Sequence, residues 1–65
     1  MQVSVNGQIE EIQAQSLESF LGSKLLLGHR IAVELNGEIV PKSQFSSVML
    51  MDGDVLEIVN AIGGG

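Results

Sequence analysis

The chain has no cysteine, no tryptophan and no tyrosine, and only three lysines and arginines among its 65 residues. Without cysteine, neither a disulfide nor a thiolate metal site can add to the stability of the fold. Eight acidic residues give a formal net charge of −5, so the chain offers no basic stripe for the phosphates of a nucleic acid. Nucleic acid is therefore excluded as an expected partner, and a positively charged protein surface is favoured.

Long apolar runs are also missing. The longest, residues 48–51, has four residues, whereas a helix that spans a bilayer needs about 20. The N-terminus has none of the basic and apolar regions of a signal peptide. We therefore expect no membrane partner and a location in the cytoplasm. The single histidine, His29, has no cluster of further ligands beside it, so we expect no metal site and no catalytic residue.

The residues that are present predict one small domain. Hydrophobic residues make up 45% of the chain, too many for an intrinsically disordered protein. A chain of this length buries only about 60% of its extended surface, which leaves one thin core and little room for a ligand pocket. We expect residues 1–60 to form the domain and residues 61–65 to be a flexible glycine tail.

The first 14 residues predict a β-hairpin. Val3 and Val5 alternate with polar residues, which is the period of a half-buried strand. Asn6-Gly7 then favours a type I′ turn, and apolar residues up to Ala14 indicate a second strand. The alternation slips at Glu10-Glu11, which predicts a β-bulge or an edge position.

The period then changes to that of a helix. Ser16 is suited to the N-cap, and Gly28 resembles a stop signal. The residues that share one helical face are Leu17, Phe20, Leu21 and Leu25. We expect one helix of about ten residues, long enough to cross between strands of one sheet.

The second half of the chain predicts further strands. Residues 31–35 alternate as a strand and lead into a second turn, Asn36-Gly37. Ile39 and Val40 continue the hairpin until Pro41 stops the pairing. Residues 42–47 predict a turn or a short helical piece, with Phe45 pointing inward.

The last part of the chain carries a third turn signal. Residues 52–54, Asp-Gly-Asp, predict a turn before a final strand over residues 55–59. Met49 and Met51 flank Leu50 at strand spacing, and we expect the two methionines in the core rather than in an apolar docking patch. The order of elements indicates an α+β fold, with a mixed four- to five-stranded sheet and one helix across one face.

The three glycines that end the sequence are its least ordinary feature. Glycine has no side chain, so Gly63 and Gly64 could thread a narrow channel and carry the carboxylate of Gly65 into a partner's active site. A carboxylate is an anion and a poor electrophile, so it would first need activation, for example as a mixed anhydride with AMP. The glycine run therefore suits a substrate handle better than a catalyst, although a flexible end without a role has the same composition.

In combination, these features resemble the ThiS family of sulfur carrier proteins of thiamine biosynthesis. The resemblance lies in residues 33–41 (Val-Glu-Leu-Asn-Gly-Glu-Ile-Val-Pro), the turn at 52–54, the strand at 55–59 and the final glycines, and it covers the whole chain in order. It implies a β-grasp, ubiquitin-like fold. The resemblance also implies that the protein is a co-substrate and not an enzyme, and that it binds no cofactor itself.

The mechanism implied by this resemblance begins at Gly65. An E1-like enzyme would adenylate its carboxylate with ATP and magnesium, and sulfur from a persulfide protein would then replace AMP. Thiazole synthase would take the sulfur from the resulting thiocarboxylate. Ubiquitin-like carriers dock through the sheet face opposite the helix, so we expect Ile62, Gly63 and Gly64 to enter the activating enzyme with Gly65.

Two other functions remain open. The small subunit of molybdopterin synthase has the same fold, tail and chemistry but a different acceptor. That family usually has a longer segment between its second and third strands, whereas residues 15–30 here hold one short predicted helix. A ubiquitin-like interaction or modifier domain is the third possibility, with an inert tail or a tail that is attached to lysines.

Overall fold

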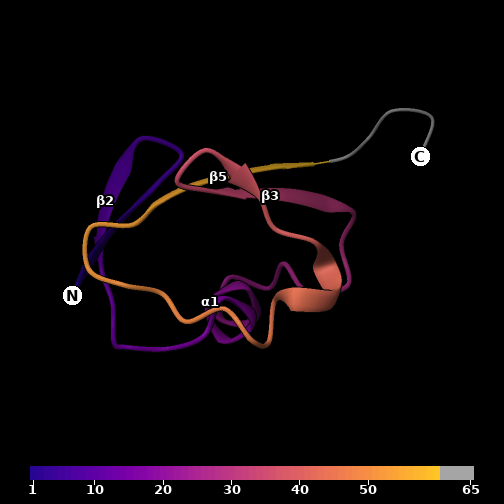
Figure 1. Cartoon of the computed structure of the whole chain (residues 1–65), viewed down its shortest axis with the longest axis horizontal. Coiled ribbons are helices and arrows are strands. Elements are labelled where there is room, and N and C mark those ends of the chain that lie inside the picture. Colours follow the sequence, from indigo (N-terminus) through magenta and orange to yellow (C-terminus); the bar gives the residue numbers. More distant parts are fainter. Residues whose placement is uncertain (61–65) are drawn as a thin grey trace.

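The computed structural model describes residues 1–60, which form a five-stranded sheet covered on one face by a helix (Figure 1). The elements in chain order are β1 (Gln2–Val5), β2 (Gln8–Glu11), α1 (Leu17–Ser23), β3 (Ile31–Leu35), β4 (Glu38–Ile39), the 3₁₀ helix η1 (Lys42–Gln44) and β5 (Val55–Asn60). The strand order is β2-β1-β5-β3-β4, with β1 parallel to β5 and the other neighbours antiparallel. The predicted α+β class and mixed sheet are confirmed. The predicted tail, residues 61–65, lies outside the described residues.

Both Asn-Gly pairs form the predicted turns. The φ angles are 51° and 86° at Asn6 and Gly7, and 52° and 87° at Asn36 and Gly37. Two successive positive φ angles define a type I′ turn, whose twist matches that of the flanking strands. Both turns therefore follow from local sequence.

The second strand is shorter than predicted, because β2 ends at Glu11 and does not reach Ala14. Its register with β1 runs without interruption from Gln2↔Glu11 to Val5↔Gln8, so the sequence slip marks no bulge. It marks an edge instead, since β2 is the outermost strand on its side of the sheet. An edge strand tolerates a charged side chain on the inner face because solvent reaches that side chain past the border of the sheet, and Glu10 pairs there with Lys24.

The helix begins as predicted but ends early. The Ser16 hydroxyl accepts a hydrogen bond from the Ser19 N–H at 3.0 Å, which is an N-cap. The helix then stops at Ser23 after seven residues, well before Gly28. The Leu26 N–H donates to the carbonyl of Leu21 (2.9 Å), and the Leu25 N–H donates to that of Gly22 (3.0 Å). These two bonds form a Schellman motif that closes the helix.

Leu25 was predicted to face the core, and this prediction is wrong. As the residue that turns the chain in the Schellman motif, Leu25 has a φ of 61° and its side chain is 81% exposed. Leu26 packs against the core in its place. A leucine in the left-handed region is strained, because its Cβ approaches the following carbonyl oxygen.

Replacing this leucine, Leu25→Gly, is expected to stabilise the protein by about 0.5–1 kcal/mol. The left-handed conformation costs a leucine about 1–2 kcal/mol, and the greater chain entropy of glycine cancels only part of the gain. Urea unfolding measures the difference. The matched control is Leu27→Gly, two residues further on, where φ is not positive and the same substitution should destabilise. A loss of stability in Leu25→Gly would contradict the assignment of strain.

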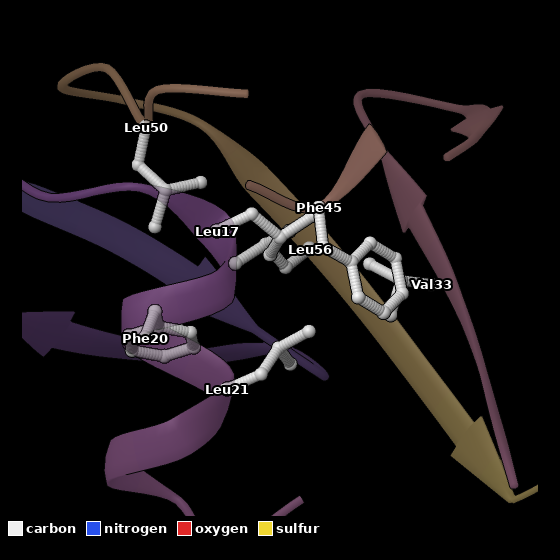
Figure 2. Packing of buried hydrophobic residues seen from close by; sticks show 7 residues of the cluster. All are labelled: Leu17, Phe20, Leu21, Val33, Phe45, Leu50 and Leu56. Atoms are coloured by element: carbon white, nitrogen blue, oxygen red, sulfur yellow. The ribbon is translucent and has the colours of Figure 1, made fainter. Parts of the chain in front are cut away.

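The core lies between α1 and the inner face of the sheet (Figure 2). Its buried residues are Leu17, Phe20, Leu21, Val33, Phe45, Leu50 and Leu56. Phe45 points inward from the end of η1, as predicted. The two methionines do not belong to the core, because Met49 is 57% and Met51 65% exposed while Leu50 between them is buried. The predicted alternation is right, and the assignment of the methionines to the core is wrong.

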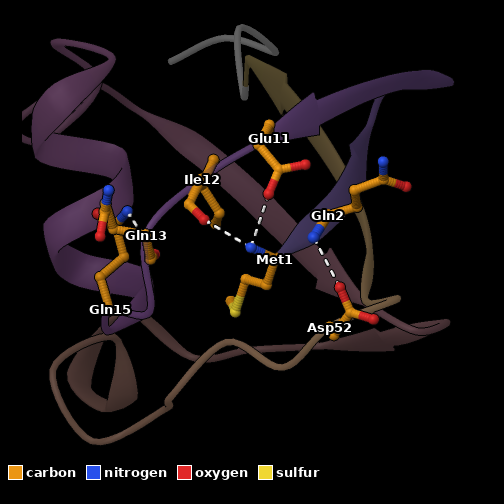
Figure 3. A network of polar contacts seen from close by, with 7 residues as sticks. All are labelled: Met1, Gln2, Glu11, Ile12, Gln13, Gln15 and Asp52. Atoms are coloured by element: carbon orange, nitrogen blue, oxygen red, sulfur yellow. Dashed lines mark hydrogen bonds and ion pairs between the residues drawn. The ribbon is translucent and has the colours of Figure 1, made fainter.

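A polar network holds the N-terminus against β2 (Figure 3). The Met1 ammonium donates to Glu11 Oε2 at 2.8 Å and to the carbonyl oxygen of Ile12 at 3.0 Å. The hydrogen bond to Glu11 raises the pKa of the Met1 amine above its ordinary value. The Gln2 N–H in turn donates to Asp52 Oδ1 at 2.7 Å, which ties β1 to the turn before β5.

Within residues 1–60, no helix has the length and apolar character needed to cross a membrane.

Candidate functional site

All four residues that the sequence predicts as the site lie outside the described part of the chain. These are Ile62, Gly63, Gly64 and Gly65. The structure does describe β5, the strand that leads to them. β5 pairs in parallel with β1 on one side and antiparallel with β3 on the other, so it is the central strand of the sheet. In the sequence, the predicted tail therefore follows the central strand, which is paired with a strand on each side.

The start of β5 is held by a buried carboxylate. Asp54 is 9% exposed, and its Oδ2 accepts the N–H of Met51 at 2.8 Å. Its Oδ1 accepts from Asn36 Nδ2 at 3.0 Å, and Asn36 Oδ1 accepts the N–H of Val55 at 2.9 Å. Both carboxylate oxygens are thus occupied in structural bonds. The Asp-Gly-Asp segment is a turn that positions β5, as the sequence predicts, and not a catalytic pair.

One face of the sheet remains uncovered by α1. The ladders place residues of β1–β5 on this face in register: Ile9 beside Ser4, Ser4 beside Val55, Ala32 beside Val59, and Glu34 beside both Glu57 and Ile39. We call it the open face and define it by its large apolar residues Ile9, Ile39, Val55 and Val59, together with Glu34 and Glu57.

The open face is both apolar and acidic. The exposed fractions of its apolar residues are 68% for Ile9, 70% for Ile39, 44% for Val55 and 58% for Val59. Large apolar residues that are exposed on one face of a domain mark a candidate protein-docking surface. The carboxylates of the open face suit a partner surface with positive charge.

The residues of the open face were not predicted from the sequence, although β5 carries a usable signal. Each face of β5 carries two apolar residues, so apolar character alone does not show which face is buried. One face has Val55, Glu57 and Val59, and the other has Leu56 and Ile58. The glutamate distinguishes them, since a charged residue at the centre of a strand marks the solvent side. Leu56 is completely buried and Ile58 packs against the core, as that rule requires.

The remaining polar candidates do not form a site. His29 is exposed, and residues 1–60 contain no group of three or more His, Asp or Glu side chains that could hold a metal ion. Glu10 makes an ion pair with Lys24 at 2.7 Å. A surface hollow of about 330 Å³ is lined by Met1, Glu11, Ile12, Gln13 and Ala14. The hollow lies at the N-terminal end of β1. Because β1 and β5 are parallel, Asn60 at the end of β5 lies at the opposite end of the sheet.

Comparison with known proteins gives consistent matches. Residues 2–65 match the model of the ThiS family. The thiazole synthase of Paramagnetospirillum magneticum is 44% identical over 66 residues, which cover all of this chain and 20% of that protein. The sulfur carrier protein ThiS of Bacillus subtilis is 40% identical over 50 residues, or 77% of this chain and 76% of that protein.

A solved structure also matches along the full chain. The crystal structure of the thiamine biosynthesis protein (ThiS) from Geobacter metallireducens has a TM-score of 0.87 and 29% identity, and each chain is covered completely. This match confirms the predicted β-grasp fold. The lengths differ among the relatives, since this chain spans about a fifth of the two thiazole synthases that it matches.

Proposed function

This chain belongs to the ThiS family, and we propose that it is a sulfur carrier for the formation of the thiazole ring of thiamine. The observation that carries the proposal is the family match over residues 2–65, which includes the three glycines as well as the folded domain. The identity of 40% to a sulfur carrier protein of Bacillus subtilis supports it further.

The proposed chemistry takes place on the carboxylate of Gly65, which must be free. An E1-like enzyme uses ATP and magnesium to join the carboxylate to AMP, and pyrophosphate leaves. The resulting acyl group is electrophilic, so the terminal sulfur of a persulfide protein attacks it and displaces AMP. This step forms a carbon–sulfur bond and leaves the sulfur–sulfur bond of the persulfide intact. A thiol then cleaves that sulfur–sulfur bond, forms a disulfide with the donor cysteine and leaves a thiocarboxylate on Gly65. In this proposal the chain is a co-substrate that binds no cofactor. We also propose a location in the cytoplasm, where ATP is available to the activating enzyme.

We propose thiazole synthase as the acceptor of the sulfur. The support is that two thiazole synthases contain a segment that matches this whole chain, one of them at 44% identity. A thiocarboxylate suits transfer to such an enzyme, since it is anionic and nucleophilic at neutral pH and stays attached to a protein that can be recognised. The short segment between β2 and β3, with α1 of seven residues, also favours this role over that of the molybdopterin synthase subunit.

Intact-protein mass spectrometry tests the function. The full chain is incubated with the activating enzyme, ATP, magnesium and a persulfide donor. The expected result is a mass gain equal to the replacement of one oxygen by sulfur, located at Gly65 and absent without ATP. No mass gain with an activating enzyme that modifies another ThiS protein would refute the proposal and favour an interaction domain.

The open face is the proposed docking surface for the activating enzyme, and Ile62, Gly63 and Gly64 are the proposed occupants of its channel. Val59 is 58% exposed on the open face and lies one residue before the end of β5. Val59→Asp is therefore expected to raise KM for this chain in ATP–pyrophosphate exchange by about tenfold, because a charge would be buried in the interface.

The matched control for the docking surface is Ser19→Asp. Ser19 is exposed on α1, on the other layer of the fold, and the substitution adds the same charge. Its KM should stay within about twofold of the unmodified chain, since an acidic residue in the first turn of a helix is tolerated. Equal KM values for the two variants would show that docking does not involve the open face.

A further inference from the structure

The side chain of Asn6 binds β5 near its C-terminal end. Asn6 Oδ1 accepts the N–H of Ile58 at 2.7 Å, and Asn6 Nδ2 donates to the carbonyl oxygen of Ile58 at 3.1 Å. The amide of one side chain thus occupies both main-chain groups of one residue that lies 52 positions further along the chain. We call this pair of hydrogen bonds the Asn6 clamp.

The Asn6 clamp lies where β1 stops supporting β5. The parallel register of these strands ends at Val5↔Leu56, and the Asn6 N–H makes a last backbone bond to the carbonyl of Leu56 at 2.9 Å. The chain then turns away at Gly7, whereas β5 continues to Asn60 beside β3. An amide side chain has the same donor and acceptor as a peptide unit, so Asn6 extends the ladder to Ile58 in place of a strand.

Turn geometry alone does not account for the Asn6 clamp. Asparagine is common at positive φ in type I′ turns, but glycine fits there equally well, and neither residue needs a contact with a third strand. The second turn makes a related contact, because Asn36 Oδ1 accepts the N–H of Val55, the first residue of β5, while Asn36 Nδ2 donates to Asp54 Oδ1. Two asparagines with nearly equal φ, 51° and 52°, therefore hold opposite ends of the strand that leads to the predicted tail.

We propose that Asn6 is a positioning residue for sulfur transfer, acting through Ile58 on the direction in which the chain leaves β5 at Asn60. The inference rests on the proposed function, because it assigns a use to the segment after Asn60. Without the clamp, Ile58 would be paired on one side only, by β3, as residues 59–60 already are. The activating enzyme would then have to order this segment itself, and its apparent affinity for the chain would fall.

The test compares Asn6→Gly with the unmodified chain in adenylation by the activating enzyme. Glycine keeps the positive φ of the turn and removes both bonds of the clamp. KM for the chain is expected to rise about tenfold while kcat stays within about twofold, since the loss is one of preorganisation and not of the reacting group. Amide hydrogen exchange of Ile58 should accelerate in the same variant, which requires no partner.

The matched control is Asn36→Gly, in the same position of the other type I′ turn. It removes the bonds to Val55 and Asp54 and lowers global stability, but it leaves Ile58 clamped. At a temperature where all variants are folded, its KM should equal that of the unmodified chain. A second variant, Asn6→Asp, keeps the acceptor for the Ile58 N–H and loses the donor, and it should also raise KM.

Two outcomes would overturn the role of Asn6. One is an unchanged KM in both Asn6 variants. The other is an equal rise of KM in Asn36→Gly, which would show that the effect comes from a loss of global stability. Failure of the proposed function is distinguishable from either. In that case the unmodified chain itself would not be adenylated, although the Ile58 amide would still exchange faster in Asn6→Gly.

Discussion

Removal of Gly64 and Gly65 together is expected to lower the rate of thiocarboxylate formation by more than about 100-fold. The truncation withdraws the carboxylate by two residues, or about 7 Å of extended chain, while a misplacement of only 1 Å can cost a reaction about 100-fold. Intact-protein mass spectrometry with the activating enzyme measures the loss. Two glycines are removed because deletion of any one of the three leaves the same sequence, which still ends in Gly-Gly.

Two controls separate this effect from unfolding and from loss of reach. The unfolding temperature of the truncated chain should match that of the full chain, because every residue of the buried core cluster lies between Leu17 and Leu56. Addition of one alanine after Gly65 keeps the reach but moves the carboxylate, and it should be equally damaging. Rapid thiocarboxylate formation by the extended chain, without prior trimming, would contradict the mechanism.

Leu56→Ala is expected to cost about 2–5 kcal/mol of unfolding free energy, a large share of the stability of so small a domain. Leu56 is completely buried, and it pairs with Val5 of β1 and Leu35 of β3 at the centre of the sheet. The alanine would leave a cavity beneath α1. Thermal unfolding should show a decrease of about 15 °C or more.

The adjacent residue supplies the control for this substitution. Val55 lies on the open face and is 44% exposed, so Val55→Ala should cost less than about 1 kcal/mol. Leu56→Met nearly conserves the buried volume and should cost less than about 1.5 kcal/mol. Similar losses for Leu56→Ala and Val55→Ala would show that the two faces of β5 are not energetically distinct.

Local sequence was sufficient for the elements whose causes are local. Both type I′ turns follow from Asn-Gly pairs, since positive φ angles are accessible to these two residues. The start of α1 follows from the hydroxyl of Ser16, which caps a residue only three positions away. The alternation in β1, β3 and β5 likewise requires no knowledge of the partner strands.

The predictions failed where the local sequence allows two conformations, namely at the end of α1 and over residues 49–51. Gly28 is a reasonable stop signal, yet the chain turns at Leu25, three residues earlier, because burial of Leu26 against the core outweighs the strain at Leu25. For Met49 and Met51, a period of two distinguishes the faces of a segment but not which face is buried. Packing decided that Leu50 points inward.

By itself, the sequence determined the α+β class, the order of elements, the two hairpin turns and the glycines that mark the candidate site, because these depend on neighbours within a few residues. Only the tertiary structure decided that β5 is central, that the open face is apolar and acidic, and that Asn6 binds Ile58. Those features depend on residues as many as 52 positions apart. Their proximity is set by which strands pair and which faces are buried in one core, and no local signal carries that information.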